Sequence, residues 1–179
     1  MTSRTCLHAL LCWILLTAMV AAQQSLQVVS LTRDGRVLVT FKLADVFNDD
    51  LRAAIKSGLT TSFVYDIELR RGSTMWLDRT IDSTTLTASV RFDNLTLRYH
   101  LTRTQDGRID VADSTDREED ARIWLTEFER LPLFSSAPLE ANAEYYLRVR
   151  AHATPRNASF VWPWARHDWT GHVKFTFLK

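Results

Sequence analysis

The sequence predicts a mainly β fold: an antiparallel β-sandwich of about eight strands, with one short and one longer amphipathic helix. Three observations support this. Apolar and polar residues alternate along most of the chain, as in antiparallel strands that turn one face to a core. Asp-Gly pairs at Asp34-Gly35 and Asp106-Gly107 separate alternating segments in the way hairpin turns do. Only two segments change to helical spacing.

Eight segments show the alternation, and their apolar residues would form the inner faces of the sheets. In chain order they are 26–31, 37–43, 63–69, 88–92, 95–101, 109–111, 145–151 and 173–177. Glycines fall between these segments, and we expect each of the five, Gly171 included, to be a turn or cap residue. No two lie close enough to form a phosphate-binding loop.

The short helix is predicted after Asn48, whose side chain can cap its first turn. Leu51, Ala54 and Ile55 are spaced to point inward from one face, and Gly58 would end the helix.

The longer helix is predicted to begin near Ser114 or Thr115, with acidic residues in its first turn, and to end at Pro132. We expect it to lie across an open end or edge of the sheets. Its apolar stripe, at steps of three and four, would be Ala121, Trp124, Leu125, Phe128 and Leu131.

Tyr145 opens an alternating segment six residues after Leu139. This spacing is typical of a tyrosine corner, in which the hydroxyl bonds back to backbone just upstream. A buried strand tyrosine is the alternative. The corner favours an immunoglobulin-like sandwich and indicates nothing about function.

The first 22 residues predict a secretory signal peptide. Arg4 precedes a 14-residue apolar run, Leu7–Val20, and small residues follow it. The run is shorter than the roughly 20 residues that a membrane-spanning helix needs, so an uncleaved anchor is the weaker alternative. We expect cleavage after Ala22, which makes residues 1–22 the signal peptide and residues 23–179 a single β-sandwich domain with no stable membrane span.

Cleavage would change the chemistry of the remaining chain. It removes Cys6 and Cys12, the only cysteines, so thiol catalysis and cysteine-bound zinc are not expected. The formal charge falls from +1 to zero with the loss of Arg4. A neutral domain whose arginines alternate with nearby acids gives no reason to expect a nucleic-acid partner.

One group of residues could bind a metal ion. His167, Asp168 and His172 lie within six positions, and this set suits zinc or a late transition metal. The spacing on a loop fixes no shared face, so an exposed loop is the alternative. The chain has no Gly-x-Ser-x-Gly nucleophile motif. We therefore expect no catalytic constellation, no resident metal and no cofactor.

The strongest candidate for a binding surface is aromatic. The segment Phe160–Trp164 and Trp169, here called the aromatic loop, place Trp162, Trp164 and Trp169 within eight residues. Clustered tryptophans anchor protein interfaces, stack on sugars or lie at membrane surfaces. Alternatively they fold back and plug one end of the sandwich.

Six ordered segments, spread over residues 26–179, carry a resemblance to a known family. They are RDGRVLVTFKLADVFNDDLRAAIKSGL, FVYDIELRR followed by Trp76, VRFDNLTLRYHLTR, FERLPLF, NAEYYLRVRA and WPWARHDWTGHVKFTF. Together they resemble a bacterial exported family described as domain of unknown function 4390. The resemblance implies a Gram-negative-type source and a location in the periplasm or outer cell envelope, and supplies no activity or site residues.

The expected function is that of a non-enzymatic exported module that binds a protein partner in the cell envelope through the aromatic loop or a sheet edge. One alternative is a carbohydrate- or lipid-binding domain in which Trp162, Trp164 and Trp169 form the platform. Another is a metal-dependent hydrolase that uses His167, Asp168 and His172.

Overall fold

The computed structural model describes residues 26–72, 79–155 and 168–178, and this part of the chain is mainly β. The predicted signal peptide lies outside it. Nine strands and two helices occur among the described residues, against the eight strands expected. They are β1 (Leu26–Arg33), β2 (Arg36–Leu43), α2 (Asp49–Lys56), β3 (Thr61–Arg71), β4 (Arg79–Asp93), β5 (Arg98–Gln105), β6 (Arg108–Thr115), α3 (Glu118–Thr126), β7 (Glu127–Ser135), β8 (Glu144–Pro155) and β9 (Asp168–Thr176).

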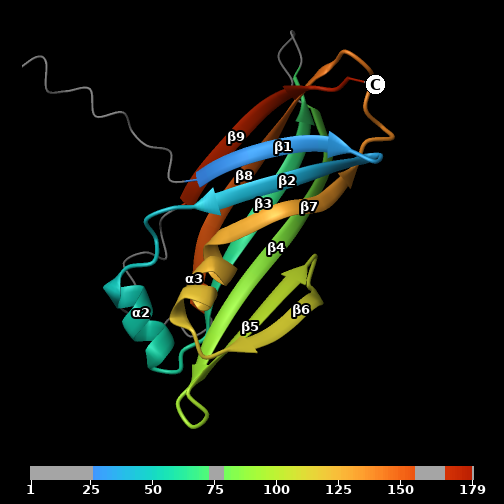
Figure 1. The fold of residues 1–179 in the computed structure, drawn as a ribbon. Coiled ribbons are helices and arrows are strands. Elements are labelled where there is room, and N and C mark those ends of the chain that lie inside the picture. The colour runs from blue at the N-terminus through green and yellow to red at the C-terminus, as the bar shows by residue number, and fades with distance from the viewer. Residues whose placement is uncertain (1–25, 73–78, 156–167, 179) are drawn as a thin grey trace, which may run out of the picture.

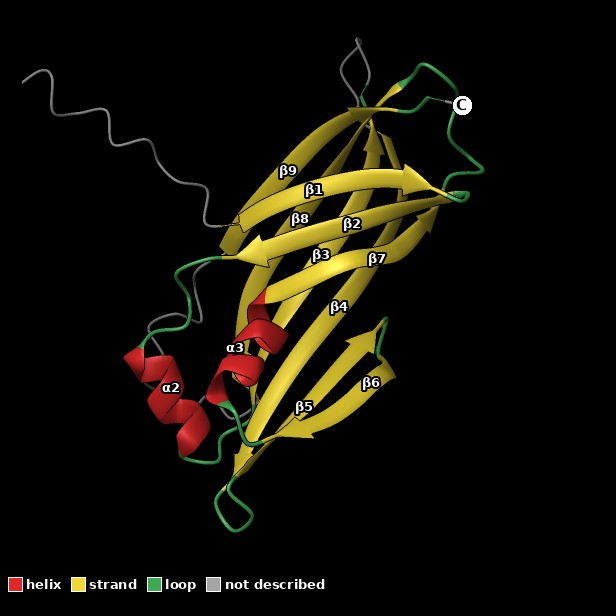
Figure 2. Cartoon of the chain, in the orientation of Figure 1, coloured by secondary structure: helices red, strands yellow, loops and turns green. Residues whose placement is uncertain are grey.

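The strands form two antiparallel sheets. The small sheet has the order β1-β2-β7 and the large sheet the order β6-β5-β4-β3-β8-β9. The small sheet lies against one half of the large sheet, and its strands cross those of the large sheet (Figure 1). Both helices lie below the small sheet, and the β5–β6 hairpin extends beyond it (Figure 2). The second layer is therefore part sheet and part helix.

An aromatic cluster joins the two layers. Phe41 and Phe128 come from paired positions on β2 and β7, and their ring centroids are 4.4 Å apart. Tyr65 of β3 packs against them at 5.0 and 4.9 Å. Its buried hydroxyl donates a 2.6 Å hydrogen bond to the carbonyl of Leu125 in α3. The large sheet is thus tied to both halves of the second layer at one place.

The predicted short helix is confirmed as α2. The Asn48 side chain accepts a 2.9 Å hydrogen bond from the Leu51 backbone N–H, and Leu51, Ala54 and Ile55 are buried. Gly58 follows the helix at a φ of +85°, a conformation that glycine adopts without a steric cost.

The predicted longer helix is wrong in its second half. α3 ends at Thr126, and Phe128, Leu131 and Pro132 lie on β7. The helical spacing of the stripe is compatible with both structures, and pairing with β2 decides between them because it places Phe128 in the aromatic cluster. Pro132 is tolerated since β7 is an edge strand of its sheet, where a missing N–H leaves no ladder bond unmade.

The fifth predicted strand begins later than expected. Leu95 and Leu97 lie in the turn before β5, with 95% and 65% of their surfaces exposed. The Asp93 carboxylate accepts hydrogen bonds from the backbone N–H groups of Leu95 and Thr96, which lowers its pKa and stabilises the turn. The apolar alternation of 95–101 therefore marks a strand only from Arg98 onward.

The predicted tyrosine corner is present. Tyr145 is buried, and its hydroxyl accepts a 2.8 Å hydrogen bond from the backbone N–H of Glu140. Leu139 is buried beside it.

Gly171 is not a boundary residue, contrary to expectation. It lies inside β9, where a Cβ atom would be 2.5 Å from the carbonyl oxygen of Leu26 and 2.7 Å from Cγ2 of Val28. Glycine is needed here because β1 of the small sheet passes directly over β9 of the large sheet (Figure 1). This contact closes one side of the sandwich.

Replacing Gly171 with alanine should lower the free energy of unfolding by about 1–3 kcal/mol, because β1 must move to admit the methyl group. Urea denaturation measures the change. Gly72→Ala is the control, since a Cβ atom there has its nearest neighbour at 3.9 Å. Equal stabilities for the two variants would contradict the close approach of β1 to β9.

Candidate functional site

The side of the sandwich opposite β1 and β9 is open. Here β7 is the outer strand of the small sheet and β6 that of the large sheet, and they do not pair with each other. Two hollows of about 220 and 400 Å³ lie between them and share Arg103 and Leu131 in their walls. We call this pair of adjoining hollows the β6–β7 groove. Its principal residues are Arg103 of β5, Val111 and Asp113 of β6, Trp124 of α3, and Leu131 and Leu133 of β7.

Arg103 lies at the centre of the groove. Its guanidinium carbon is 4.3 Å from the centroid of the Trp124 ring and 4.2 Å from that of Phe128. One terminal nitrogen donates hydrogen bonds to the carbonyls of Trp124 and Glu127, at 2.8 and 2.9 Å. Those carbonyls belong to the last turn of α3 and the first residue of β7. Arg103 thus holds the helix-to-strand transition in place, and burial lowers the pKa of its guanidinium.

The groove combines apolar walls with acidic side chains. Apolar surface comes from Val111, which is 45% exposed, and from the α3 and β7 residues on the opposite wall. Carboxylates of Asp110, Asp113 and Glu129 also line it. Within the described chain these three form no ion pair within 4 Å, whereas Arg103 is already bound to two carbonyls. The open side therefore combines apolar groove walls with an excess of negatively charged side chains.

The outer edge of β6 is exposed. In the described part of the chain β6 pairs only with β5, so the backbone groups of its other edge have no strand partner. Its apolar Ile109 and Val111 are 73% and 45% exposed. An unpaired edge beside an apolar groove is a place where a further strand can add.

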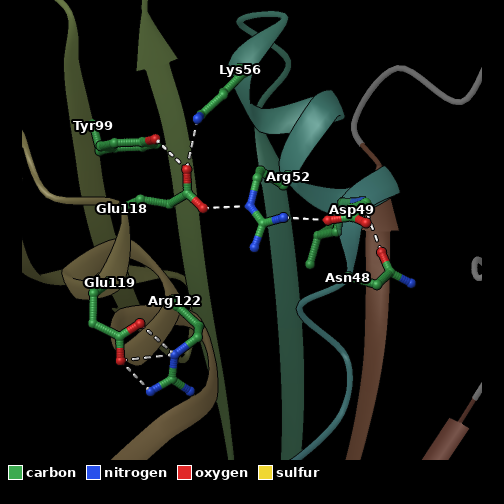
Figure 3. Close-up of polar contacts among 9 residues, drawn as sticks. Asn48, Asp49, Arg52, Lys56, Tyr99, Glu118, Glu119 and Arg122 are labelled. Carbon is green, nitrogen blue, oxygen red and sulfur yellow. Dashed lines mark hydrogen bonds and ion pairs between the residues drawn. The ribbon is translucent and has the colours of Figure 1, made fainter.

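A polar cluster fixes the two helices relative to each other (Figure 3). Glu118, in the first turn of α3, receives hydrogen bonds from Arg52 and Lys56 of α2, the latter at 2.8 Å. The Tyr99 hydroxyl approaches the same carboxylate at 3.4 Å. The Lys56 ammonium is the main cause of a lowered Glu118 pKa. The cluster acts as a structural brace because its ion pairs join the first turn of α3 to α2.

The predicted aromatic surface is described at one position only. Trp169 of β9 is half-buried and packs on Phe63, with ring centroids 6.1 Å apart. It lines a hollow of about 240 Å³ beside the start of α2. Trp162 and Trp164 lie outside the described residues. For Trp169, the packing is that of a residue covering the core.

The structure does not bring together the metal-binding candidates that it describes. Asp168 and His172 are both exposed on β9, four residues apart on one face, which places their Cα atoms about 13 Å from each other. His167 lies outside the described residues. Among the residues that are described, no three His, Cys, Asp or Glu side chains gather as metal ligands.

No helix in residues 26–72, 79–155 or 168–178 is both long and apolar enough to cross a membrane.

Sequence reasoning missed the β6–β7 groove, although one signal was present. Tyr99, Leu101 and Arg103 alternate along one strand, so Arg103 falls on the inner face. A cation on the inner face of a predicted strand indicates a special environment, because an arginine is almost never buried unless it is paired.

Comparison with known protein families adds one match. The family model described as Domain of unknown function (DUF4390) matches residues 21–158. The chain belongs to this family. The match confirms the family resemblance found from the sequence, over residues 21–158, and the β6–β7 groove of this DUF4390 protein lies wholly within this range. Comparisons with curated proteins and with solved structures gave no match.

Replacing Arg103 with lysine should lower the free energy of unfolding by about 1–3 kcal/mol, because an ammonium cannot lie flat between two rings and bond both carbonyls. Urea denaturation gives the value. Arg91→Lys, on the exposed outer face of β4, is the matched control and should change little. An Arg103→Lys variant as stable as the control would show that Arg103 does not anchor the end of α3.

Replacing Glu118 with glutamine should destabilise the fold by about 1 kcal/mol at neutral pH, because the brace loses its charge. The Glu118 pKa is lowered in the folded state, so the brace stabilises fully above its ordinary value of 4.5 and is lost as pH falls through the folded pKa. The difference between the variant and the parent should therefore shrink as the pH falls below 4.5 and through the folded-state pKa.

Urea unfolding at neutral pH and at a series of acidic pH values measures this difference. Asp116→Asn, an exposed carboxylate just before α3, is the control and should show no such pH-dependent difference. If Glu118→Gln still lowers the free energy of unfolding by the same amount at low pH, the contribution of Glu118 does not depend on its charge.

Proposed function

We propose that this protein is an exported, non-enzymatic module of the bacterial periplasm or outer cell envelope, and that it binds a protein partner through the β6–β7 groove. The observation that supports the proposal best is the open side of the sandwich, where apolar groove walls adjoin the unpaired edge of β6. Surfaces of this kind serve association between chains rather than chemistry on small molecules.

The groove supports partner binding better than the aromatic loop does. Trp169 packs on Phe63, so its ring contributes to the core. On β6, by contrast, Val111, which lines the groove, and Ile109, which does not, are exposed although they are apolar. A strand end that extends beyond the second layer gains little for stability by carrying such residues. A binding role accounts for them.

The location rests on residues 1–22. This segment has the features of a cleaved export signal: a basic residue, an apolar run shorter than a membrane span, and small residues around the cleavage site. After cleavage at Ala22 the remaining chain has no cysteine, so its folding would not depend on disulfide formation in the envelope.

We also propose that the sandwich is a variant of the immunoglobulin-like class. The tyrosine corner at Tyr145 and the two antiparallel layers support this. The aligned packing typical of that class differs from the crossing of the two sheets seen in Figure 1. The proposal therefore concerns shared structural motifs, and does not require the same sheet packing or strand order.

Site-specific photocrosslinking in intact cells tests the proposed function. A photoreactive amino acid at Val111 should yield one specific adduct with an envelope protein, because this side chain faces the groove. The same amino acid at Thr170, exposed on β9, is the control and should not yield that adduct. The identified partner should form the same adduct with the purified protein. Identical products from both positions, or none, would contradict binding at the groove.

A further inference from the structure

The proposed function leaves the chemistry of the partner open, and three properties of the groove specify it. We propose that the β6–β7 groove binds an extended segment of the partner that adds to β6 as a further strand and whose groove-facing side chains include both apolar and basic residues. This proposal rests on the proposed function and makes it specific.

The backbone favours β6 over β7 as the strand that receives the segment. From Val111 to Thr115, β6 pairs with β5 in unbroken register, so its outer edge presents regularly spaced donors and acceptors. β7 contains Pro132, a positive φ at Arg130 and two register shifts against β2. Prolines and irregularities of this kind protect an edge from pairing. β6 has no proline.

The side chains define an alternating pattern. Val111, Asp113 and Thr115 occupy every second position of β6 and line the groove. A strand paired to β6 would likewise turn every second side chain toward the groove. There it would meet Leu131 and Leu133 on the opposite wall. Apolar side chains at those positions would be removed from water on binding.

The charges indicate a basic segment. Asp110, Asp113 and Glu129 line the groove and form no ion pair among the described residues. Asp120 is a fourth carboxylate in the lining, but it accepts a hydrogen bond from Thr115 and forms an ion pair with Arg117 at 3.7 Å. Arg103, the cation between them, is held by rings and carbonyls. Lysine or arginine side chains of a bound segment would complement the unpaired carboxylates and accelerate association at low salt.

The same charges disfavour a second copy of this chain as the occupant. Two β6 strands paired edge to edge would bring the Asp110 and Asp113 carboxylates of one copy close to those of the other. Like charges on adjacent strands destabilise the pair. Edge strands use inward charges in this way against self-association while remaining open to a complementary partner.

A designed peptide tests the proposal with the purified protein. The probe is a fluorescein-labelled ten-residue peptide in which threonine alternates with valine and lysine in turn, so that valine and lysine lie on the same face of the extended peptide. Binding of this valine–lysine peptide is followed by fluorescence anisotropy. We expect saturable binding that weakens as salt is added. Replacing every lysine of the peptide with glutamate should weaken binding by at least about tenfold. Equal binding of both peptides would overturn the charge requirement.

Protein variants locate the binding surface. Combined Asp110→Asn, Asp113→Asn and Glu129→Gln substitutions should weaken binding of the valine–lysine peptide by about tenfold or more. Asp34→Asn, Asp50→Asn and Asp168→Asn together remove the same number of charges from exposed positions elsewhere and should leave binding unchanged. Equal losses in both variants would show that the peptide responds to net charge and not to the groove.

Two methylated peptides test strand addition. In each peptide every second backbone amide is N-methylated. The two peptides differ in which amides are methylated, so the methyl groups lie along one edge of the first extended peptide and along the opposite edge of the second. One should lose binding and the other retain it, because only one edge can face β6. Equal binding by both would overturn the added strand.

The outcomes separate this proposal from the proposed function. No peptide binding, together with a specific Val111 adduct to a folded partner, would overturn the basic segment and keep the groove as a binding site. No peptide binding and no adduct would overturn both. Concentration-dependent dimerisation in sedimentation that the valine–lysine peptide does not reverse would assign β6 to a second copy and overturn the proposal.

Discussion

The hydrogen bond from the Tyr65 hydroxyl to the Leu125 carbonyl is the contact on which the second layer depends. It lies in the aromatic cluster of Phe41, Phe128 and Tyr65, at the point where α3 ends and β7 begins. Arg103 bonds the carbonyls on either side of the same junction. The chain can thus change from helix to strand without leaving buried carbonyls unsatisfied, and the groove exists because the layer changes type here.

Much of the fold could be predicted from the sequence, because period-two alternation and the Asn48 cap are local signals. The errors fall where tertiary contacts decide between two local structures. Phe128 follows Trp124 at helical spacing, yet the aromatic cluster requires it on a strand. Leu95 continues an alternation but lies in a turn made by the Asp93 carboxylate. Gly171 resembled a boundary residue because the passage of β1 over β9 joins segments distant in sequence.

The candidate site was less predictable than the fold. The groove is built from β5, β6, α3 and β7, and its opening depends on which strands end up at the sheet edges. Strand order cannot be read from alternation, since every strand with one buried face shows the same pattern. The carboxylates of Asp110 and Asp113 look like ordinary solvated side chains in the sequence. Their significance comes from the unpaired edge on which they lie.

The passage of β1 over β9 also affects when the fold can form. β1 is the first strand that the structure describes and β9 the last, so the side that they close stays open until nearly all of the chain is available. Contacts between segments so far apart in sequence make folding slow. The chain loses conformational entropy when its ends come together, and the packing contacts that offset this loss form only afterwards. The proposed export would benefit from such a delay, since a chain that crosses a membrane unfolded must not fold before it has crossed.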